Sequence, residues 1–298
     1  MKQILITGGS GLVGTRLSEI LTEKGYAVRH LSRTVNGNEK YLTFRWDLAD
    51  KFIDPKAFEG IHIIIHLAGT NVSSGRWTDA KKKEILSSRI DTMHLLQEKL
   101  QNQKLEAFIS ASGISYYGTE TTEKTFKETD PAGTDFIAQV SVKWEAACDV
   151  FKTNTDRIIA LRTGIVLSRE GGALAKLKQP IKMGIGSPLG SGKQYMPWIH
   201  LEDLCLMYVA AIENTAIKGI YNAVSDQHIN NAGMTKVIAD VLNKKLWAPA
   251  VPAFVLKLLF GEMANIILKG SRIDNEKIKA AGFQFKYPQL KPALEDLL

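Results

Sequence analysis

Short apolar runs alternate along the chain with longer segments in which apolar residues recur every three or four positions. The first run covers residues 4–6, and Leu17, Ile20 and Leu21 follow at helical spacing until Gly25. Because strands and helices alternate in this way, we expect right-handed crossovers and a parallel sheet. The pattern predicts an α/β fold with a doubly wound, Rossmann-type parallel sheet. Its further strands are predicted at 26–32, 41–46, 61–67, 107–111 and 157–162, and its further helices at 79–100 and 136–151.

After Gly164 the regular alternation fades into a glycine-containing, loop-rich stretch as far as residue 192, and substrate contacts often lie in such stretches. The predicted division is a Rossmann domain over 1–165, to which later sheet and helix elements return, and a smaller substrate-side α/β lobe over 166–298. The lobe includes a small C-terminal domain at 247–298. It is expected to combine a helix at 202–213, a strand at 219–223, a helix at 232–242 and a helical tail.

The longest apolar stretch, 251–268, is interrupted by Pro252, Lys257, Gly261 and Glu262 and is too broken to cross a bilayer. We interpret it as a pair of amphipathic core helices, with docking on a membrane surface as the alternative. No integral membrane segment is expected.

Composition narrows the class of protein. A chain of 298 residues with 45% hydrophobic and 23% charged residues is typical of a soluble globular protein. Its net charge of +7 comes from lysines spread along the chain, which favours anionic small molecules over nucleic acid as partners. Cys148 and Cys205 are too few for a disulfide framework and lack metal-ligand spacing. We expect a cytoplasmic protein without a metal site or a secretory leader; a homodimer is allowed but not fixed by the sequence.

The first strand runs straight into a glycine motif that opens a helix. Gly8 can adopt backbone conformations closed to other residues, Gly11 lets the main chain approach a pyrophosphate, and Gly14 lets the helix pack closely on the strand. The helix N-terminus then favours the negative charge of the pyrophosphate. An ordinary glycine-rich turn is the alternative, but the position after a first strand favours a dinucleotide site. The residues assigned to this contact are Gly8, Gly11, Leu12, Val13 and Gly14.

The end of the second strand bears on which dinucleotide is bound. A fold that selects NAD carries an acidic residue there, whereas this chain has Ser32 and Arg33. A guanidinium beside a hydroxyl can hold a 2′-phosphate through charge-assisted hydrogen bonds. We therefore expect NADP(H) in the domain at 1–165; an arginine that only faces solvent is the alternative.

Several motifs, taken together, resemble those of a known family. They are 7–14, Asp47-Leu48, His66-Leu67-Ala68-Gly69, Arg89 within 87–92, Trp144-Glu145, 161–167, 190–194 and 197–203. In these motifs the chain is similar to the extended short-chain dehydrogenase/reductases, and more closely to an atypical branch of NAD-dependent epimerase/dehydratase-like proteins, some of them labelled cell-division inhibitors. The tail from Trp247 resembles a small C-terminal domain of unknown function in that branch.

The resemblance implies which residues contact NADP. Leu67, Ala68 and Gly69 are also favoured physically, because they leave the carboxyl end of a strand, where open α/β sheets bind ligands. Asp47, next to Leu48, is placed to accept a hydrogen bond from the adenine amino group or to cap the next helix. The contacts implied by the resemblance are Ser32, Arg33, Leu67, Ala68, Glu84, Arg89 and Val166, of which Glu84 and Arg89 could instead carry an internal ion pair.

Catalysis is where the chain departs from the family pattern. Typical members use Tyr-x-x-x-Lys on a helix beside the nicotinamide, where the lysine lowers the phenol pKa from about 10. This chain has Gln139 in the tyrosine position and keeps Lys143. Since glutamine does not titrate, the usual mechanism cannot operate unchanged. Lys143 can still bind the nicotinamide ribose, or it can simply face solvent.

The segment after the fifth strand resembles the one that supplies the catalytic Ser or Thr. Ser112 is our choice for that hydroxyl, with Ser110 and Ser115 as neighbouring alternatives; Ser110 is also assigned to the cofactor. The missing proton donor has three candidates, Tyr116, Tyr117 and His200, although such tyrosines often only pack and such histidines often lie in a core.

Two functions remain open on the sequence. One is an NADP(H)-dependent oxidoreductase or epimerase acting on a small polar or nucleotide-linked substrate. The other is a catalytically weak NADP(H)-dependent regulatory or interaction protein, linked to cell division in some family labels.

Overall fold

The computed structural model describes residues 1–298 and is built around an eight-stranded sheet with the strand order β11-β8-β6-β5-β1-β2-β3-β4. All neighbouring strands are parallel except the last pair, β3 and β4. The doubly wound Rossmann sheet predicted from the sequence is confirmed. The strands are β1 (Gln3–Thr7), β2 (Ala27–Ser32), β3 (Leu42–Asp47), β4 (Phe52–Ile53), β5 (Ile63–His66), β6 (Ala107–Gly113), β8 (Ile158–Thr163) and β11 (Gly219–Ala223).

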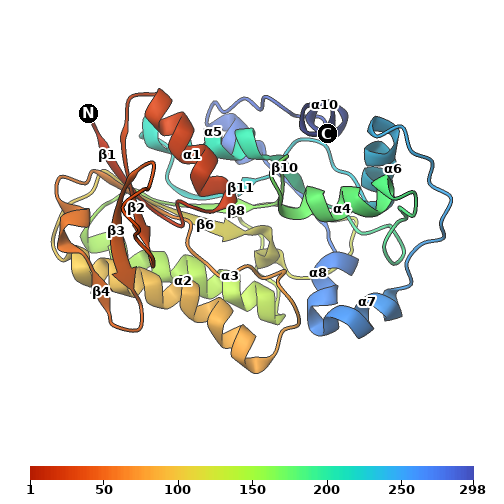
Figure 1. Ribbon diagram of the computed structural model, residues 1–298, viewed down its shortest axis with the longest axis horizontal. Coiled ribbons are helices and arrows are strands. Elements are labelled where there is room, and N and C mark those ends of the chain that lie inside the picture. Colours follow the sequence, from red (N-terminus) through yellow and green to blue (C-terminus); the bar gives the residue numbers. More distant parts are fainter.

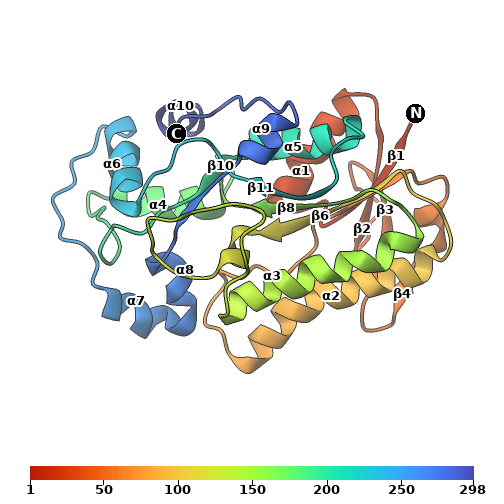
Figure 2. The same ribbon diagram turned by 180° about the vertical axis from the view of Figure 1, so that it is seen from behind.

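Helices cover both faces of the sheet (Figures 1 and 2). On one face lie α1 (Leu12–Glu23) and α5 (Leu201–Glu213), which pack against each other; on the other lie α2 (Asp79–Leu100) and α3 (Phe136–Ala147). Each face has its own buried cluster of apolar side chains. Strand β5 is fully buried, as its run of isoleucines predicts for a strand covered on both sides. Short 3-10 helices at Pro55–Phe58, Ile114–Tyr117 and Cys148–Thr153 connect these layers.

Two elements expected in the smaller lobe belong to the Rossmann layers instead. Strand β11 pairs with β8 at the edge of the main sheet, and α5 packs on α1. They are the later elements that return to the first domain. The physical reason is that the apolar face of α5, which includes Leu204 and Tyr208, completes the cluster above the sheet.

The smaller lobe is mostly helical. Its core joins α4 (Gly172–Lys182), α6 (Asn231–Val241) and α10 (Leu290–Leu297) to the two-stranded sheet of β9 (Ile165–Leu167) and β10 (Trp198–His200). The sequence predicted only a loop-rich stretch after Gly164 and did not predict α4 within it. The glycines at the start of α4 and Pro180 inside it are residues that disfavour a helix in a sequence-based prediction. The helix is stabilised by burial of Leu174 and Ile181.

The tail adds α7 (Ala253–Phe260), a 3-10 turn at Gly261–Ala264, α8 (Asn265–Leu268) and α9 (Glu276–Ala280). A second two-stranded sheet pairs β7 (Thr125–Phe126) with β12 (Arg272–Ile273). The prediction that 251–268 forms a pair of core helices was wrong for α7, where only Leu256 is buried, because no further layer covers the outer face of the helix. None of the helices combines the length and apolar character needed to span a bilayer.

Candidate functional site

The glycine turn between β1 and α1 is closely packed around its own backbone. A Cβ atom on Gly14 would lie 2.3 Å from the carbonyl oxygen of Gly8, and Gly8 itself has a φ of +71°. Helix α1 begins at Leu12 after Gly11, with no side chain capping its first N–H groups. The turn therefore leaves backbone donors open at a helix N-terminus, as an anion site requires.

A buried hydrogen-bonded chain fixes the end of β5 beside this turn. Thr7 Oγ1 lies 2.8 Å from His66 Nδ1 and accepts from the Ala68 backbone N–H at 3.2 Å, while His66 Nε2 lies 3.3 Å from Thr92 Oγ1. Burial lowers the His66 pKa to about 3, so the ring is neutral. The structure thus brings Leu67 and Ala68 within about 3 Å of the position of a Cβ on Gly8.

Arg89 is a buried cation whose hydrogen bonds are incomplete. Its Nη1 donates to the Ile85 carbonyl oxygen at 2.9 Å, its guanidinium lies over the Trp144 ring at 4.6 Å, and its Nε has no partner. A Cβ on Gly69 would lie 3.1 Å from the Arg89 Cζ. Burial lowers its pKa to about 10, so it keeps its charge at neutral pH. An unpaired donor on a buried cation beside the end of β5 fits an anionic or polar ligand.

Glu84 lies on α2 and Arg33 in the loop after β2, close enough for the Arg33 charge to lower the Glu84 pKa. Glu84 Oε1 accepts a hydrogen bond from Thr70 Oγ1 at 2.9 Å, and Glu84 forms an ion pair with Lys81 at 3.1 Å. The Glu84 pKa is lowered, mainly by Lys81, and Thr70 and Arg33 lower it further. Glu84 therefore does not pair with Arg89, which was one alternative. Arg33 is exposed beyond β2, next to Ser32.

The remaining predicted cofactor residues differ in how they are placed. The Asp47 carboxylate accepts from the backbone N–H groups of Ala49 and Asp50, so it caps a turn and not a helix. Leu12, Val13 and Val166 are partly buried and Leu48 is exposed, whereas Ser110 is fully buried and its hydroxyl donates to the Ala111 carbonyl oxygen.

Ser112 contacts a buried ion pair that sequence reasoning missed. Its hydroxyl donates to Glu145 Oε1 at 2.7 Å, and Glu145 also receives both Nε and Nη2 of Arg162 at 2.8 Å each. Burial opposes the charge on Arg162, but the contacts with Glu145 outweigh it and raise the Arg162 pKa. The sequence signal for this ion pair was Arg162 itself, a charged residue in the otherwise apolar strand β8. It lies in the 161–167 motif, which was used only to establish the family resemblance.

Tyr116 and Tyr117, the two tyrosine candidates, both contact the Arg162 guanidinium. Tyr117 is buried, accepts from Arg162 Nη1 at 2.9 Å and donates to Asn222 Oδ1 at 2.7 Å. Burial raises its pKa to about 12, which removes it from proton exchange near neutral pH. Tyr116 lies with its ring centroid 3.3 Å from the Arg162 guanidinium carbon. Both side chains contact the cation from within the fold.

Gln139 and Lys143 lie one turn apart on the exposed face of α3. The Gln139 amide donates to the Gly133 carbonyl oxygen at 3.2 Å. The opposite face of the helix carries Ser141, whose hydroxyl lies 2.9 Å from that of Ser115. The α3 face that approaches the end of β6 therefore presents Ser141 and Glu145, and not Gln139 and Lys143.

His200 lies elsewhere in the fold. Its Nδ1 accepts from the Glu202 backbone N–H at 3.1 Å as the N-cap of α5, its ring stacks on Tyr287, and Nε2 is 3.4 Å from Asp296 Oδ2. Burial lowers the His200 pKa. The structure brings His200 to α10 and does not bring it to Ser112.

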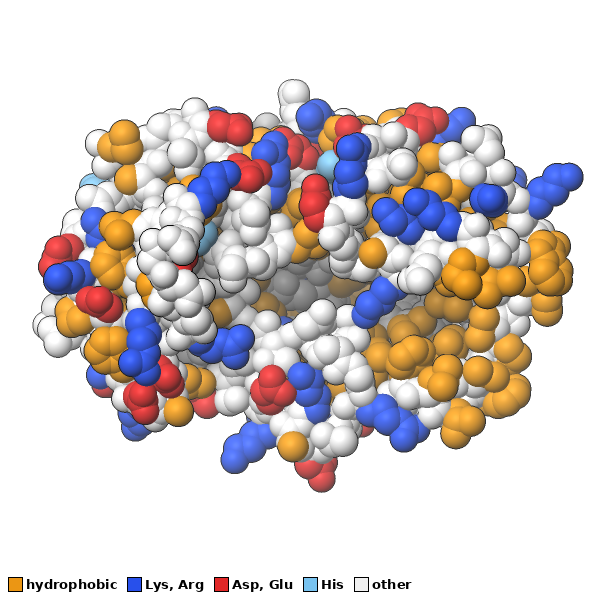
Figure 3. Space-filling view, in the orientation of Figure 1, with side chains coloured by type: hydrophobic (Ala, Val, Ile, Leu, Met, Phe, Trp, Pro, Cys, Tyr) orange, Lys and Arg blue, Asp and Glu red, His pale blue; other side chains and the backbone are white.

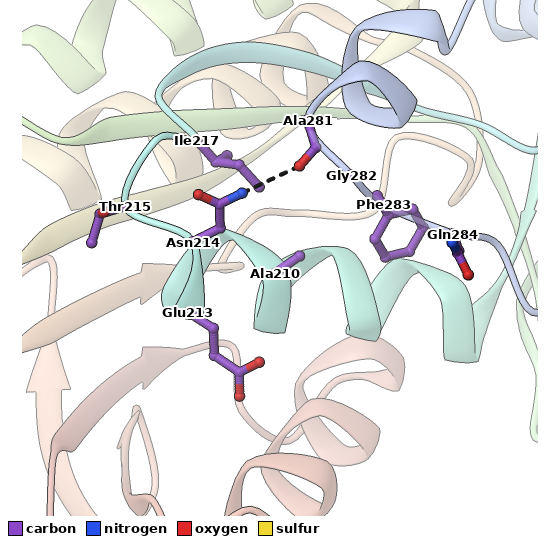
Figure 4. A pocket seen from close by; sticks show the side chains of 9 residues that line it. All are labelled: Ala210, Glu213, Asn214, Thr215, Ile217, Ala281, Gly282, Phe283 and Gln284. Carbon is purple, nitrogen blue, oxygen red and sulfur yellow. Dashed lines mark hydrogen bonds between the residues drawn. The ribbon is translucent and has the colours of Figure 1, made fainter.

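Neither of two cavities outside the glycine turn gathers the predicted residues. A cavity of about 540 Å³ lies between the end of α5 and the segment after α9, lined by residues that include Asn214 and Phe283 (Figure 4). A second, of about 210 Å³, contains His200 with Arg16 and Asp296. Of the predicted cofactor residues, those of the glycine turn, Arg33 and residues 67–69 instead follow the carboxyl ends of β1, β2 and β5.

Comparison with known proteins identifies the family of the chain. Residues 4–223 match the NAD dependent epimerase/dehydratase family, and residues 251–297 match a domain of unknown function, DUF1731. The chain belongs to the NAD dependent epimerase/dehydratase family, as the resemblance in its motifs predicted. A relative from Mus musculus, epimerase family protein SDR39U1, is 32% identical over 302 residues and 99% of both chains. The chloroplastic SDR39U1 homolog of Arabidopsis thaliana is 34% identical over 99% of this chain and 86% of its own length.

Solved structures show the same arrangement of elements. The human epimerase family protein SDR39U1, crystallised with NADPH, is 30% identical, covers 99% of this chain and 98% of its own, and superposes with a TM-score of 0.88. A nucleoside-diphosphate sugar epimerase from Corynebacterium glutamicum is 28% identical with a TM-score of 0.79; this chain spans 58% of its length.

Proposed function

We propose that this chain binds NADP(H) and acts as an oxidoreductase or epimerase on a small polar or nucleotide-linked substrate. The observation that carries the proposal is the closed glycine turn, where a Cβ on Gly14 would meet the Gly8 backbone at 2.3 Å while the first N–H groups of α1 stay uncapped. A pyrophosphate fits such a turn, since the backbone can approach it and the helix dipole favours its charge.

Other residues around the turn fit the rest of the cofactor. Arg89 offers a buried donor without a partner at the end of β5, and Leu67 to Gly69 are partly exposed beside it. The human relative that contains NADPH in its crystal structure supports the choice of cofactor. Arg33 supports the 2′-phosphate form, because no acidic side chain follows β2 at Ser32 to repel a phosphate.

The chain's own residues would orient the substrate and hold protons. Bound NADP(H) supplies a hydride acceptor or donor. Ser112 offers a hydroxyl whose proton already points at the Glu145 carboxylate, and Arg162 holds that carboxylate in place. Lys143 can reach solvent-side groups from α3, where it is exposed. Because the Ser112 proton is donated to Glu145, the Ser112 oxygen would accept a hydrogen bond from a substrate hydroxyl.

Calorimetric titration of NADPH and NADH, followed by a carbonyl and nucleotide-sugar panel read at the nicotinamide absorbance band, tests this function. Saturable NADPH binding with weaker NADH binding and turnover of at least one panel member is expected. Failure to bind NADPH at saturating supply would reject the proposal.

A regulatory role is the second candidate, because Gln139 stands where the family's proton-transferring tyrosine is expected. Restoring the tyrosine with Gln139→Tyr should raise turnover if the protein is an enzyme of low efficiency. A regulator would remain without turnover in the same variant, and NADPH would instead change its association in size-exclusion chromatography.

A further inference from the structure

Six large apolar side chains are exposed together on the smaller lobe, and we call them the apolar patch. Figure 3 shows apolar side chains gathered over α7 and the loop that precedes it. Trp247 and Phe254 are 73% and 72% exposed. A contiguous apolar surface of this kind is uncommon on a protein that contacts only water, and it marks an interaction site. The members of the patch are Met183, Ile185, Trp247, Phe254, Leu258 and Leu259.

The segments that carry the patch are fixed to one another. The Trp247 indole N–H donates to the Gly184 carbonyl oxygen at 2.7 Å, which joins the loop before α7 to the turn after α4. Val251 exchanges backbone hydrogen bonds of 2.8 and 2.9 Å with Gly190 and Pro188. Because the indole donor is already satisfied, the ring can leave water without an unpaired N–H. The patch is a preformed surface.

The charge around the patch is mostly positive, and Glu262, which follows α7, is paired with Lys82. Residues 171–201 contain four lysines and residues 241–261 contain three, and neither segment contains an aspartate or glutamate. Lys182 and Lys257 directly precede Met183 and Leu258, Lys244 lies three residues before Trp247, and all three lysines are exposed. Long lysine side chains can lay their methylene stems along an apolar surface while the ammonium stays in water. The surface is apolar with a cationic border.

We propose that the apolar patch docks the protein on the surface of an anionic lipid bilayer. Apolar and aromatic side chains would enter the boundary between headgroups and acyl chains, and the lysines would face the lipid phosphates. A second copy of the chain fits poorly, since a two-fold contact would bring lysines against lysines, and the carboxylate that follows α7, Glu262, already pairs with Lys82. Nucleic acid offers the charge but no apolar layer for Leu258 and Phe254.

Sedimentation with vesicles tests the proposal on the full chain. The protein is expected to sediment with vesicles of phosphatidylcholine and phosphatidylglycerol in equal amounts, and not with phosphatidylcholine alone, and added salt should release it. Trp247 is the only tryptophan exposed at its surface, so the same vesicles should shift the emission to the blue, and Trp247→Phe should abolish that shift. No binding to the mixed vesicles would overturn the proposal.

Variants separate the two parts of the surface. Phe254→Ser with Leu258→Ser should lower vesicle binding about tenfold or more, as should Lys182→Glu with Lys257→Glu. Leu42→Ser is the matched control, because Leu42 is 58% exposed on β3, outside the patch. Circular dichroism checks folding. An equal loss of vesicle binding in the control, or a patch variant that binds as the wild type does, would contradict the assignment. If light scattering shows a dimer that Phe254→Ser with Leu258→Ser converts to a monomer, the patch binds a second copy of the chain instead.

Discussion

Glu145 on α3 and Arg162 on β8 form a buried, two-pronged ion pair, with Nε–Oε1 and Nη2–Oε2 distances of 2.8 Å. Arg162 is 1% exposed and Glu145 9%. The pair also receives the Ser112 hydroxyl and lies against both tyrosines that follow β6. The ion pair therefore connects α3, which carries Gln139 in the position of the family's catalytic tyrosine, to the end of β6. Ser112, the residue predicted to bind a substrate oxygen, lies at that end.

Glu145→Ala should destabilise the protein by about 3–5 kcal/mol, because it leaves the Arg162 charge buried without a partner. Urea denaturation measures the loss. The exposed pair Lys24–Glu213, with a distance of 3.0 Å, is the control, and Glu213→Ala should cost no more than about 1 kcal/mol. Similar costs for the two substitutions would mean that the buried pair is not a structural anchor.

Gly14→Ala should abolish NADPH binding. The new Cβ would meet backbone of Gly8 and Gly9 at 2.3 to 2.8 Å, so the turn must open and its N–H groups would no longer converge. Calorimetric titration measures binding. Gly171→Ala is the control, since nothing lies within 4 Å of its Cβ position, and it should bind NADPH as the wild type does. Unchanged affinity in Gly14→Ala would remove the glycine turn from the cofactor site.

Arg33→Ala should weaken NADPH binding by about 10- to 100-fold and leave NADH binding nearly unchanged, since a charge-assisted hydrogen bond is worth about 1.5–3 kcal/mol. Lys51→Ala removes an exposed positive charge between β3 and β4 and serves as the control for net charge. An equal loss of affinity for both cofactors would show that Arg33 does not read the 2′-phosphate.

Stability should fall steeply on mild acidification. Burial lowers the pKa of His30 to about 4 and of His66 to about 3, whereas an unfolded histidine titrates near 6.5. Between pH 6.5 and about 4 the unfolded chain therefore binds more protons, so stability is present above pH 6.5 and is lost as the pH falls. Each histidine contributes a slope of about 1.4 kcal/mol per pH unit. Urea denaturation at several pH values across this range measures the free energy of unfolding. His30→Gln should reduce the slope of that free energy against pH by the contribution of one histidine. A flat profile would contradict the neutral, buried state of both rings.

The fold and the cofactor turn could be predicted because their signals are local. The isoleucines of β5 and the glycine spacing at 8–14 each specify a conformation within a few neighbouring residues. Helix α4 was missed because the glycines at its start and Pro180 inside it are also typical of loops, and only burial of Leu174 and Ile181 against the lobe makes it a helix. Tyr117 and His200 were reasonable proton donors by residue type, but the fold gives them Asn222 and Asp296 as neighbours.

By itself the sequence determined the parallel sheet, the helix that begins after Gly11 and the family to which the chain belongs, since periodicity and glycine placement are properties of adjacent residues. Only the tertiary structure decided that Arg162 forms an ion pair with Glu145, that Arg89 is buried with its Nε–H unpaired, and that most of α7 is exposed. Burial and pairing depend on which distant segments pack together, and desolvation acts on a side chain only once those segments have met.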